Sequence, residues 1–159
     1  MLCTPMWKPT SEQSEKLFAE LGRCVFTYQA IELRLKFLLP HMIIPGTENH
    51  AKGEGIGDWR VYLDSKETMG MLMQRLKDRS VLHDVLARDW TQLVEQRNEV
   101  VHHFLEQPFA KLESEAAFNE AIRFLQDRRT FASTLLNTLQ AICVAFSYSL
   151  EMTSFPDML

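Results

Sequence analysis

The sequence predicts an all-α protein, a bundle of four to five helices with one long irregular loop after the first helix. Hydrophobic residues recur every three to four positions over long stretches, which is the period of an α-helix. No stretch keeps the alternation of a half-buried β-strand. Six of the twelve glycines and prolines fall within residues 40–64, and these residue types interrupt regular structure. We therefore place the loop at 40–64.

Length and composition predict one helical domain spanning residues 1–159. A chain of 159 residues can bury a full hydrophobic core. Its hydrophobic content of 46% and charged content of 24% are ordinary for a soluble globular protein. The net charge of -4 argues against a protein that coats nucleic acid through bulk charge, because such domains are usually basic. A local basic cleft stays compatible with this charge.

Three widely spaced cysteines, Cys3, Cys24 and Cys143, form no C-x-x-C pair. This excludes a zinc ribbon or a thioredoxin-like motif, and the sparse, odd count favours a reducing compartment. The most apolar run, residues 135–150, is interrupted by five polar residues, so it predicts a core helix rather than a membrane span. We expect a cytoplasmic protein with no membrane segment, no metal and no cofactor.

The first helix is expected over residues 11–39, after a flexible arm at residues 1–9 that contains two prolines. Thr10, Ser11 and Ser14 are typical of a helix start, and Ser11 is the expected cap. The apolar stripe of this helix comprises Leu17, Leu21, Cys24, Tyr28, Ile31, Leu35 and Leu39.

Further helices are expected after the loop. A second helix begins at Asp64 or Ser65, and a third runs from about residue 81 to Phe104 before Pro108 closes it. The last begins after Ser114. Its apolar stripe includes Phe118, Ile122, Leu125, Ala132, Leu135, Leu139 and Ile142.

Arg97 lies on the apolar face of the third predicted helix. A buried guanidinium costs several kcal/mol unless something pairs with it. Arg97 is therefore either half of a structural ion pair or a functional group in a cleft. At about 100° per residue, the hydrophobic residues within about 40° of Arg97 are Leu86, Trp90, Leu93, Val101 and Phe104.

Glu32 is the predicted partner for Arg97. It lies within about 60° of Tyr28 and Leu35 on the first helix, so it is also a charged residue on a mostly apolar face. An inward arginine and an inward glutamate favour a bidentate ion pair. The pair is compatible with a purely structural role and with a functional one.

His102 and His103 follow near the end of the same helix, where the helix dipole favours a protonated imidazole. Imidazole groups titrate near neutral pH, which suits general acid or base catalysis. In a regular helix His102 lies about 140° around from Arg97. The two side chains then meet only if the helix distorts near its end, or if two subunits pair about a two-fold axis.

The segment from Arg97 to His102 has the order Arg-x4-His, with a polar residue directly after the arginine and apolar residues before the histidine. It resembles the signature of the HEPN superfamily (higher eukaryotes and prokaryotes nucleotide-binding domains). Members are small helical bundles whose motif is an arginine, four to six residues and a histidine at or near a helix end. The motif covers six residues here, and the predicted helical layout agrees with it.

The resemblance implies metal-independent RNA cleavage by a homodimer whose two motifs face each other, plausible for a toxin or a phage-defence effector. His102 would act as general base or acid, and Arg97 would neutralise charge on the phosphoryl oxygens. Asn98 would orient the phosphate or hold the histidine, and Glu32 and His103 are supporting candidates.

The alternative is a non-catalytic HEPN-like interaction module, such as an antitoxin, immunity or regulatory partner, because several members have lost catalysis. The acidic pI near 5.7 would then suit a basic partner protein. Two residues depart from the family pattern. Phe104 replaces a tyrosine that can be nucleotidylated in related toxins, and Glu99 adds negative charge beside the phosphate site.

Overall fold

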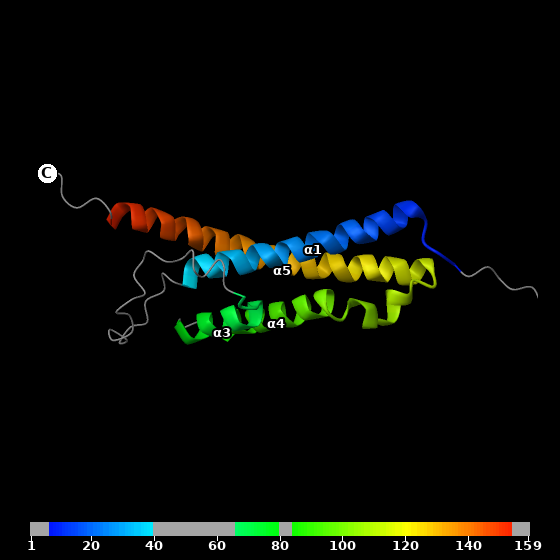
Figure 1. Cartoon of the computed structure of the whole chain (residues 1–159), viewed down its shortest axis with the longest axis horizontal. Coiled ribbons are helices and arrows are strands. Elements are labelled where there is room, and N and C mark those ends of the chain that lie inside the picture. The colour runs from blue at the N-terminus through cyan, green and yellow to red at the C-terminus, as the bar shows by residue number, and fades with distance from the viewer. Residues whose placement is uncertain (1–6, 40–65, 80–83, 154–159) are drawn as a thin grey trace, which may run out of the picture. The chain divides into compact units, whose positions relative to one another are not determined.

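A computed structural model describes residues 7–39, 66–79 and 84–153, and in these ranges all regular structure is helical (Figure 1). Four α-helices are present among them. They are α1 (Ser11–Leu38), α3 (Met69–Arg79), α4 (Asp84–Val101) and α5 (Glu115–Thr153). Two short 3₁₀ helices, η2 (Phe104–Glu106) and η3 (Pro108–Lys111), connect α4 to α5. The all-α prediction is confirmed for the described residues. The predicted loop at 40–64 and most of the arm at 1–9 lie outside them.

The chain divides into two compact units. Unit 1 comprises Met1–Tyr28 and Thr91–Ser133, and unit 2 comprises Gln29–Trp90 and Thr134–Leu159. Unit 1 therefore holds the first part of α1, the second part of α4, both 3₁₀ helices and the first part of α5. All residues of the Arg-x4-His motif belong to unit 1.

A reciprocal capping box fixes the start of α1. The backbone N–H of Thr10 donates to Gln13 Oε1 at 2.8 Å, and the N–H of Gln13 donates to Thr10 Oγ1 at 3.2 Å. Thr10 is thus the cap, and Ser11, the expected cap, is instead the first helical residue. A threonine followed three residues later by glutamine satisfies two backbone donors at once, which explains the shift by one residue.

The buried face of α1 agrees with the predicted stripe. Leu17, Cys24, Tyr28, Ile31, Leu35 and Leu39 are all buried, whereas Leu21 is half-buried. On α5, Ser114 caps the helix as predicted, since its Oγ accepts the N–H of Ala117 at 3.1 Å. The predicted α5 stripe is buried as far as Leu139, but Ile142 is 43% exposed and Cys143 is buried in its place.

A buried carboxylate joins α1 to α5 inside unit 1. Glu20 is only 5% exposed, and its Oε1 accepts from Arg129 Nε at 2.5 Å. Its Oε2 accepts from Arg23 Nη1 at 2.9 Å. Beside it, the Cys24 thiol donates to the carbonyl of Leu125 at 3.2 Å. The contacts with Arg129 and with the carbonyl of Leu125 link α1 to α5.

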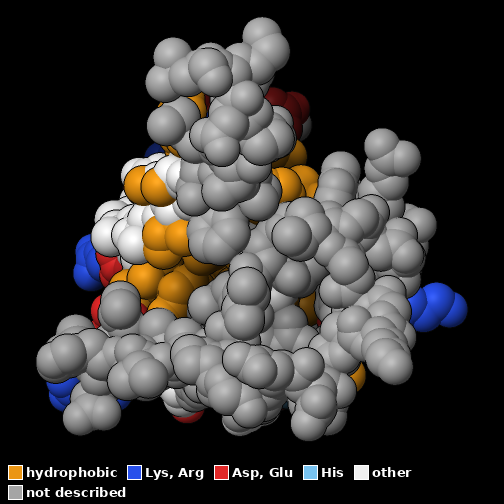
Figure 2. Space-filling view, turned by 90° about the vertical axis from the view of Figure 1, so that its left-hand side faces the viewer, with side chains coloured by type: hydrophobic (Ala, Val, Ile, Leu, Met, Phe, Trp, Pro, Cys, Tyr) orange, Lys and Arg blue, Asp and Glu red, His pale blue; other side chains and the backbone are white. Residues whose placement is uncertain are grey.

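In unit 2 the buried side chains come from α1, α3, α4 and α5, and they include Leu35, Met69, Leu72, Trp90 and Leu139. Arg34 Nε donates to Gln140 Oε1 at 2.6 Å, which links α1 and α5 in this unit. Hydrophobic side chains of described residues are also visible on the face drawn in Figure 2. None of the helices in the described ranges is long and apolar enough to cross a membrane.

Candidate functional site

The C-terminal end of α4 brings Arg97 and His102 together within one chain. The helix ends at Val101, and the N–H groups of His102 and His103 both donate to the carbonyl of Asn98, at 2.9 and 3.2 Å. This shared acceptor turns the chain out of its helical path. As a result, Arg97 Nη1 lies 2.7 Å from His102 Nε2.

The regular helix to Phe104 assumed from the sequence is therefore wrong, and so is the 140° separation of Arg97 and His102 that followed from it. His102 lies just beyond the helix, so the rotation of about 100° per helical residue does not set the direction of its ring relative to Arg97. Of the two routes that could join the pair, distortion at the helix end is the one observed. The contact needs no second subunit.

The Arg97–His102 contact defines the proton on the imidazole. A guanidinium can only donate hydrogen bonds, so Nε2 of His102 is the acceptor and the ring carries its proton on Nδ1 in this arrangement. The same Arg97 Nη1 donates to Asn98 Oδ1 at 3.2 Å. The side chain of Asn98 thus contacts Arg97, and its backbone carbonyl accepts the two N–H groups of the turn. The predicted role of Asn98, to orient a phosphate or to hold the histidine, stays a prediction.

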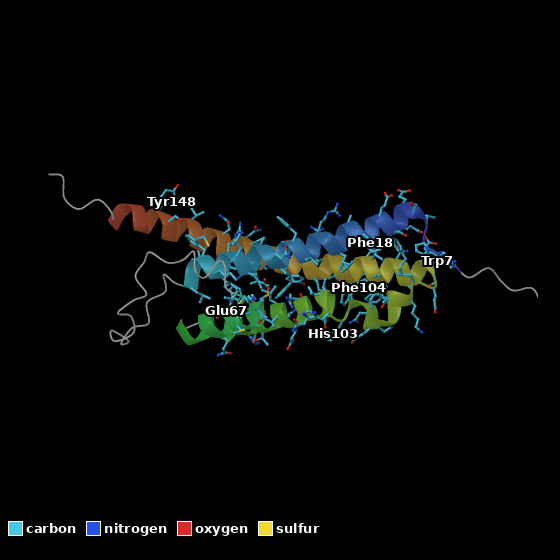
Figure 3. All side chains as sticks on the ribbon, viewed as in Figure 1. Trp7, Phe18, Glu67, His103, Phe104 and Tyr148 are labelled. Atoms are coloured by element: carbon cyan, nitrogen blue, oxygen red, sulfur yellow. The ribbon has the colours of Figure 1, made fainter. Side chains whose placement is uncertain are left out.

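His103 forms a second imidazole site beside the first. Its Nδ1 lies 3.0 Å from Glu106 Oε2, and the centroids of the His102 and His103 rings are 6.3 Å apart, edge to face. The side chain of His103 is 52% exposed. With Nδ1 engaged by the carboxylate, Nε2 is the nitrogen that His103 can offer to a ligand. Figure 3 labels His103 on the chain.

Arg128 of α5 neutralises Glu99 of the motif. Its Nε and Nη2 both donate to Glu99 Oε2, at 3.2 and 2.9 Å, and its guanidinium carbon lies 3.7 Å from the centre of the Phe124 ring. The negative charge that Glu99 brings to the motif is therefore balanced within unit 1. The sequence analysis did not identify Arg128 as a partner of Glu99. The feature of the sequence that could have indicated this ion pair is Glu99, an acidic residue on the half-buried part of α4.

Three aromatic rings hold the segment that carries the histidines. Phe104, Phe109 and Phe124 have centroids 5.0–6.2 Å apart in tilted arrangements, the spacing of favourable aromatic pairs. Phe109 is buried. The segment ends at Leu112, which adopts a left-handed conformation with φ of 49°. Phe104 is thus a half-buried ring that packs against its neighbours.

Tyr28 adds a buried polar group to unit 1 that the sequence did not single out for function. It is 2% exposed, and its hydroxyl has no hydrogen-bond partner among the described residues. Burial is the main reason that its pKa is raised above the ordinary value, and the neighbouring Cys24 raises it further. The hydroxyl therefore stays protonated at physiological pH.

The buried face of α4 is centred closer to Leu93 and Val100 than the sequence predicted. Both are buried, Arg97 is half-buried at the edge of this face, and Val101 is 39% exposed. Glu32 is half-buried on α1 but belongs to unit 2, whereas Arg97 belongs to unit 1. The Glu32–Arg97 pair therefore stays a prediction.

No group of three or more histidine, cysteine, aspartate or glutamate side chains placed to hold a metal ion occurs within residues 7–39, 66–79 and 84–153. The histidines of the site instead pair with an arginine and a carboxylate. Comparisons of the chain with protein-family models, with curated proteins and with solved structures find no match.

Proposed function

We propose that this protein is an endoribonuclease of the HEPN type that cleaves RNA without a metal ion. One observation carries the proposal: Arg97 Nη1 and His102 Nε2 lie 2.7 Å apart at the exposed end of a helix. A permanent cation and an imidazole in contact are the groups that phosphodiester cleavage needs, because one stabilises phosphoryl charge and the other moves a proton.

The reaction begins with a ribose 2′-hydroxyl. An incoming phosphodiester attracts the Arg97 guanidinium, which exchanges His102 Nε2 for a phosphoryl oxygen. The released Nε2 then accepts the 2′-hydroxyl proton while the 2′-oxygen forms its bond to phosphorus. The bond from phosphorus to the 5′-oxygen breaks. The products are a 2′,3′-cyclic phosphate and a 5′-hydroxyl end.

His103 would give the proton that the leaving 5′-oxygen takes. Its ring lies beside that of His102, and Glu106 engages its Nδ1, so Nε2 is free to point toward a phosphodiester that Arg97 holds. This division makes His102 the base and His103 the acid. It requires both histidines of one chain and no residue of a second chain.

The charge balance of the site is compatible with an anionic substrate in spite of the overall charge of -4. Arg128 engages the carboxylate of Glu99, so the motif does not present an unpaired negative charge at that residue. RNA would thus be held by local contacts rather than by bulk attraction, and the salt dependence of binding should be modest because few phosphates are neutralised.

Cleavage of a defined single-stranded RNA by purified protein in the presence of a chelator tests this function. We expect His102→Ala and Arg97→Ala each to lower the rate by about a hundredfold or more. Arg123→Ala is the matched control, since Arg123 is an exposed arginine on α5 outside the site, and it should cleave at the parental rate. If both site variants cleave as fast as the parent, the assignment is wrong.

A substrate with a better leaving group separates the two histidines. A 5′-bridging phosphorothiolate leaves without protonation, so it should restore the rate of His103→Ala but not that of His102→Ala. Equal restoration of both variants would contradict the division into base and acid.

A non-catalytic role as a protein-interaction module is the second candidate. Leu105 is 84% exposed and Val101 is 39% exposed, so apolar side chains flank the two histidines and could contact an antitoxin or a regulatory partner. A stably co-purifying protein together with the absence of RNA cleavage would favour this role. A toxin-antitoxin or phage-defence setting in the cytoplasm is part of the main proposal, and neighbouring genes would test it.

A further inference from the structure

One side of α5 contacts the Arg-x4-His motif and the segment after it at two points. Arg128 donates to Glu99 Oε2 from Nε and Nη2, at 3.2 and 2.9 Å. Phe124 stands four residues before Arg128, so both project from the same side of α5, and its ring centre lies 6.2 Å from that of Phe104. Glu99 precedes the turn that ends α4, and Phe104 follows it. We call Phe124 and Arg128 the α5 clamp.

The two contacts are joined to each other through a cation–π interaction. The guanidinium carbon of Arg128 lies 3.7 Å from the centre of the Phe124 ring, well within the range of attraction between a guanidinium and an aromatic face. The Arg128 side chain is only 24% exposed, so solvent screens its interactions less than at an open surface. The same guanidinium thus holds an acid on one side of the turn and the ring that packs against the other side.

The turn itself has few side chains that hold it in place. Val101, His102 and His103 are all exposed, so burial of their own side chains does not fix their positions. Before the turn Val100 is buried, and after it Phe104 is the first residue that is not exposed. The position of His102 therefore depends on how the residues on both sides of the turn are held.

We propose that Arg128 is a positioning residue for the Arg97–His102 pair. By binding Glu99 and stacking on Phe124, it fixes the two sides of the turn relative to each other. His102 Nε2 is thereby kept at 2.7 Å from Arg97 Nη1, and Arg128 needs no contact with the substrate. The effect on cleavage rests on the proposed ribonuclease function, whereas the effect on the His102 ring does not.

The simpler role for Arg128 is to neutralise the charge of Glu99, and a lysine distinguishes the two roles. An ammonium group would supply the same charge to the carboxylate. It lacks the planar fork of a guanidinium, which donates from two nitrogens to a carboxylate and stacks on an aromatic ring. Arg128→Lys should therefore preserve the charge neutralisation and lose the clamp.

Nitrogen-15 NMR of the full chain with neutral imidazoles reports the state of His102 without any substrate. In the parent, Nε2 accepts from Arg97, so we expect a ring with its proton held on Nδ1. In Arg128→Ala and Arg128→Lys the ring should be released, and its two nitrogens should then show a mixture of both tautomers. Spectra of His102→Gln identify the signals of this ring among the five histidines.

Arg129→Ala is the matched control. Arg129 is the next residue on α5, and it donates to the buried carboxylate of Glu20 at 2.5 Å. Its removal therefore breaks an ion pair of the same unit without touching the clamp. All spectra are recorded well below the melting temperature of each variant, so that a loss of stability alone does not change the ring. We expect Arg129→Ala to keep the parental tautomer.

Cleavage kinetics give the second readout. A displaced His102 slows the chemical step without weakening substrate binding. Arg128→Ala and Arg128→Lys should therefore each lower kcat about tenfold or more and leave KM within about twofold of the parent. Arg129→Ala should keep the parental kcat.

A parental tautomer in Arg128→Ala would overturn the proposal at any cleavage rate, and so would a parent that already shows both tautomers. Parental behaviour of Arg128→Lys would overturn it in favour of simple neutralisation of Glu99. A raised KM with a parental kcat would overturn it in favour of a substrate contact. If the tautomer changes as expected but the parent does not cleave RNA, the positioning role stands and the ribonuclease function fails.

Discussion

The ion-pair cluster around Glu20 makes a sharp prediction about stability. Glu20 is 5% exposed and accepts from Arg129 of α5 and from Arg23 one turn along α1. Arg129→Met removes the interhelical partner and leaves a buried carboxylate with only Arg23, whose side chain is 60% exposed. We expect the unfolding free energy to fall more for this change than for removal of the carboxylate itself.

The magnitude follows from burial. Breaking a fully buried ion pair costs about 3–5 kcal/mol. The Arg129 side chain is 36% exposed, and Arg23 still compensates part of the charge, so roughly 2 kcal/mol is expected for Arg129→Met. Glu20→Gln removes the charge that needs compensation and should cost about 1 kcal/mol. The double variant should lose about 1 kcal/mol less unfolding free energy than the sum of the losses in the two single variants.

Urea unfolding followed by circular dichroism measures these values, with an unchanged dependence on denaturant as the sign of an intact native state. Arg123→Met, an exposed arginine on the same helix, is the control and should change the unfolding free energy by less than about 0.5 kcal/mol. Equal and additive effects of Glu20→Gln and Arg129→Met would refute the reasoning, because Glu20 would then not depend on its interhelical partner.

Two further predictions concern α1. Burial is the main cause that raises the pKa of Cys24 from 9.0 to about 11, and the charge of Glu20 raises it further. The neutral thiol therefore stabilises the fold in full below about pH 9, and this contribution is lost as the pH rises toward 11. Between these pH values the parent should lose roughly 2–3 kcal/mol more than Cys24→Ala in denaturant titrations, and parallel losses would contradict the burial of the thiol. Thr10→Ala should cost about 1 kcal/mol because it removes half of the capping box. Ser11→Ala should cost less than half of that in the same assay, and the reverse order would show that Ser11 is the cap.

Periodicity sufficed to predict the helices and most of their buried residues. The buried apolar residues of α1 follow from the spacing of apolar residues in the sequence. The Ser114 cap of α5 follows from the identity of one capping residue. Glu20 shows what the same pattern can reveal. It stands three residues after Leu17 and four before Cys24, so its position on the buried face was visible, but its partner Arg129 is 109 residues away and no local rule supplies that pairing.

The end of α4 could not be predicted for a different reason. Val100, Val101 and Phe104 continue the helical spacing, and no glycine or proline interrupts the chain before Pro108. The helix nevertheless ends at Val101 because the carbonyl of Asn98 accepts two backbone donors. The packing of Phe104 against Phe109 and Phe124 accompanies this turn. Such competition between a continuing helix and a tertiary contact leaves no mark in residue spacing.

The same turn decides which changes in length the motif can absorb. Within a continuous helix, an inserted residue rotates everything beyond it by about 100°. His102 instead lies in a turn after the last helical residue, so an extra residue there would enlarge a loop without turning a helix. With four, five or six residues between the arginine and the histidine, the two side chains could then still reach the same contact. In such a motif, the distance that the turn can span decides whether the two side chains meet, and the rotation of the helix does not.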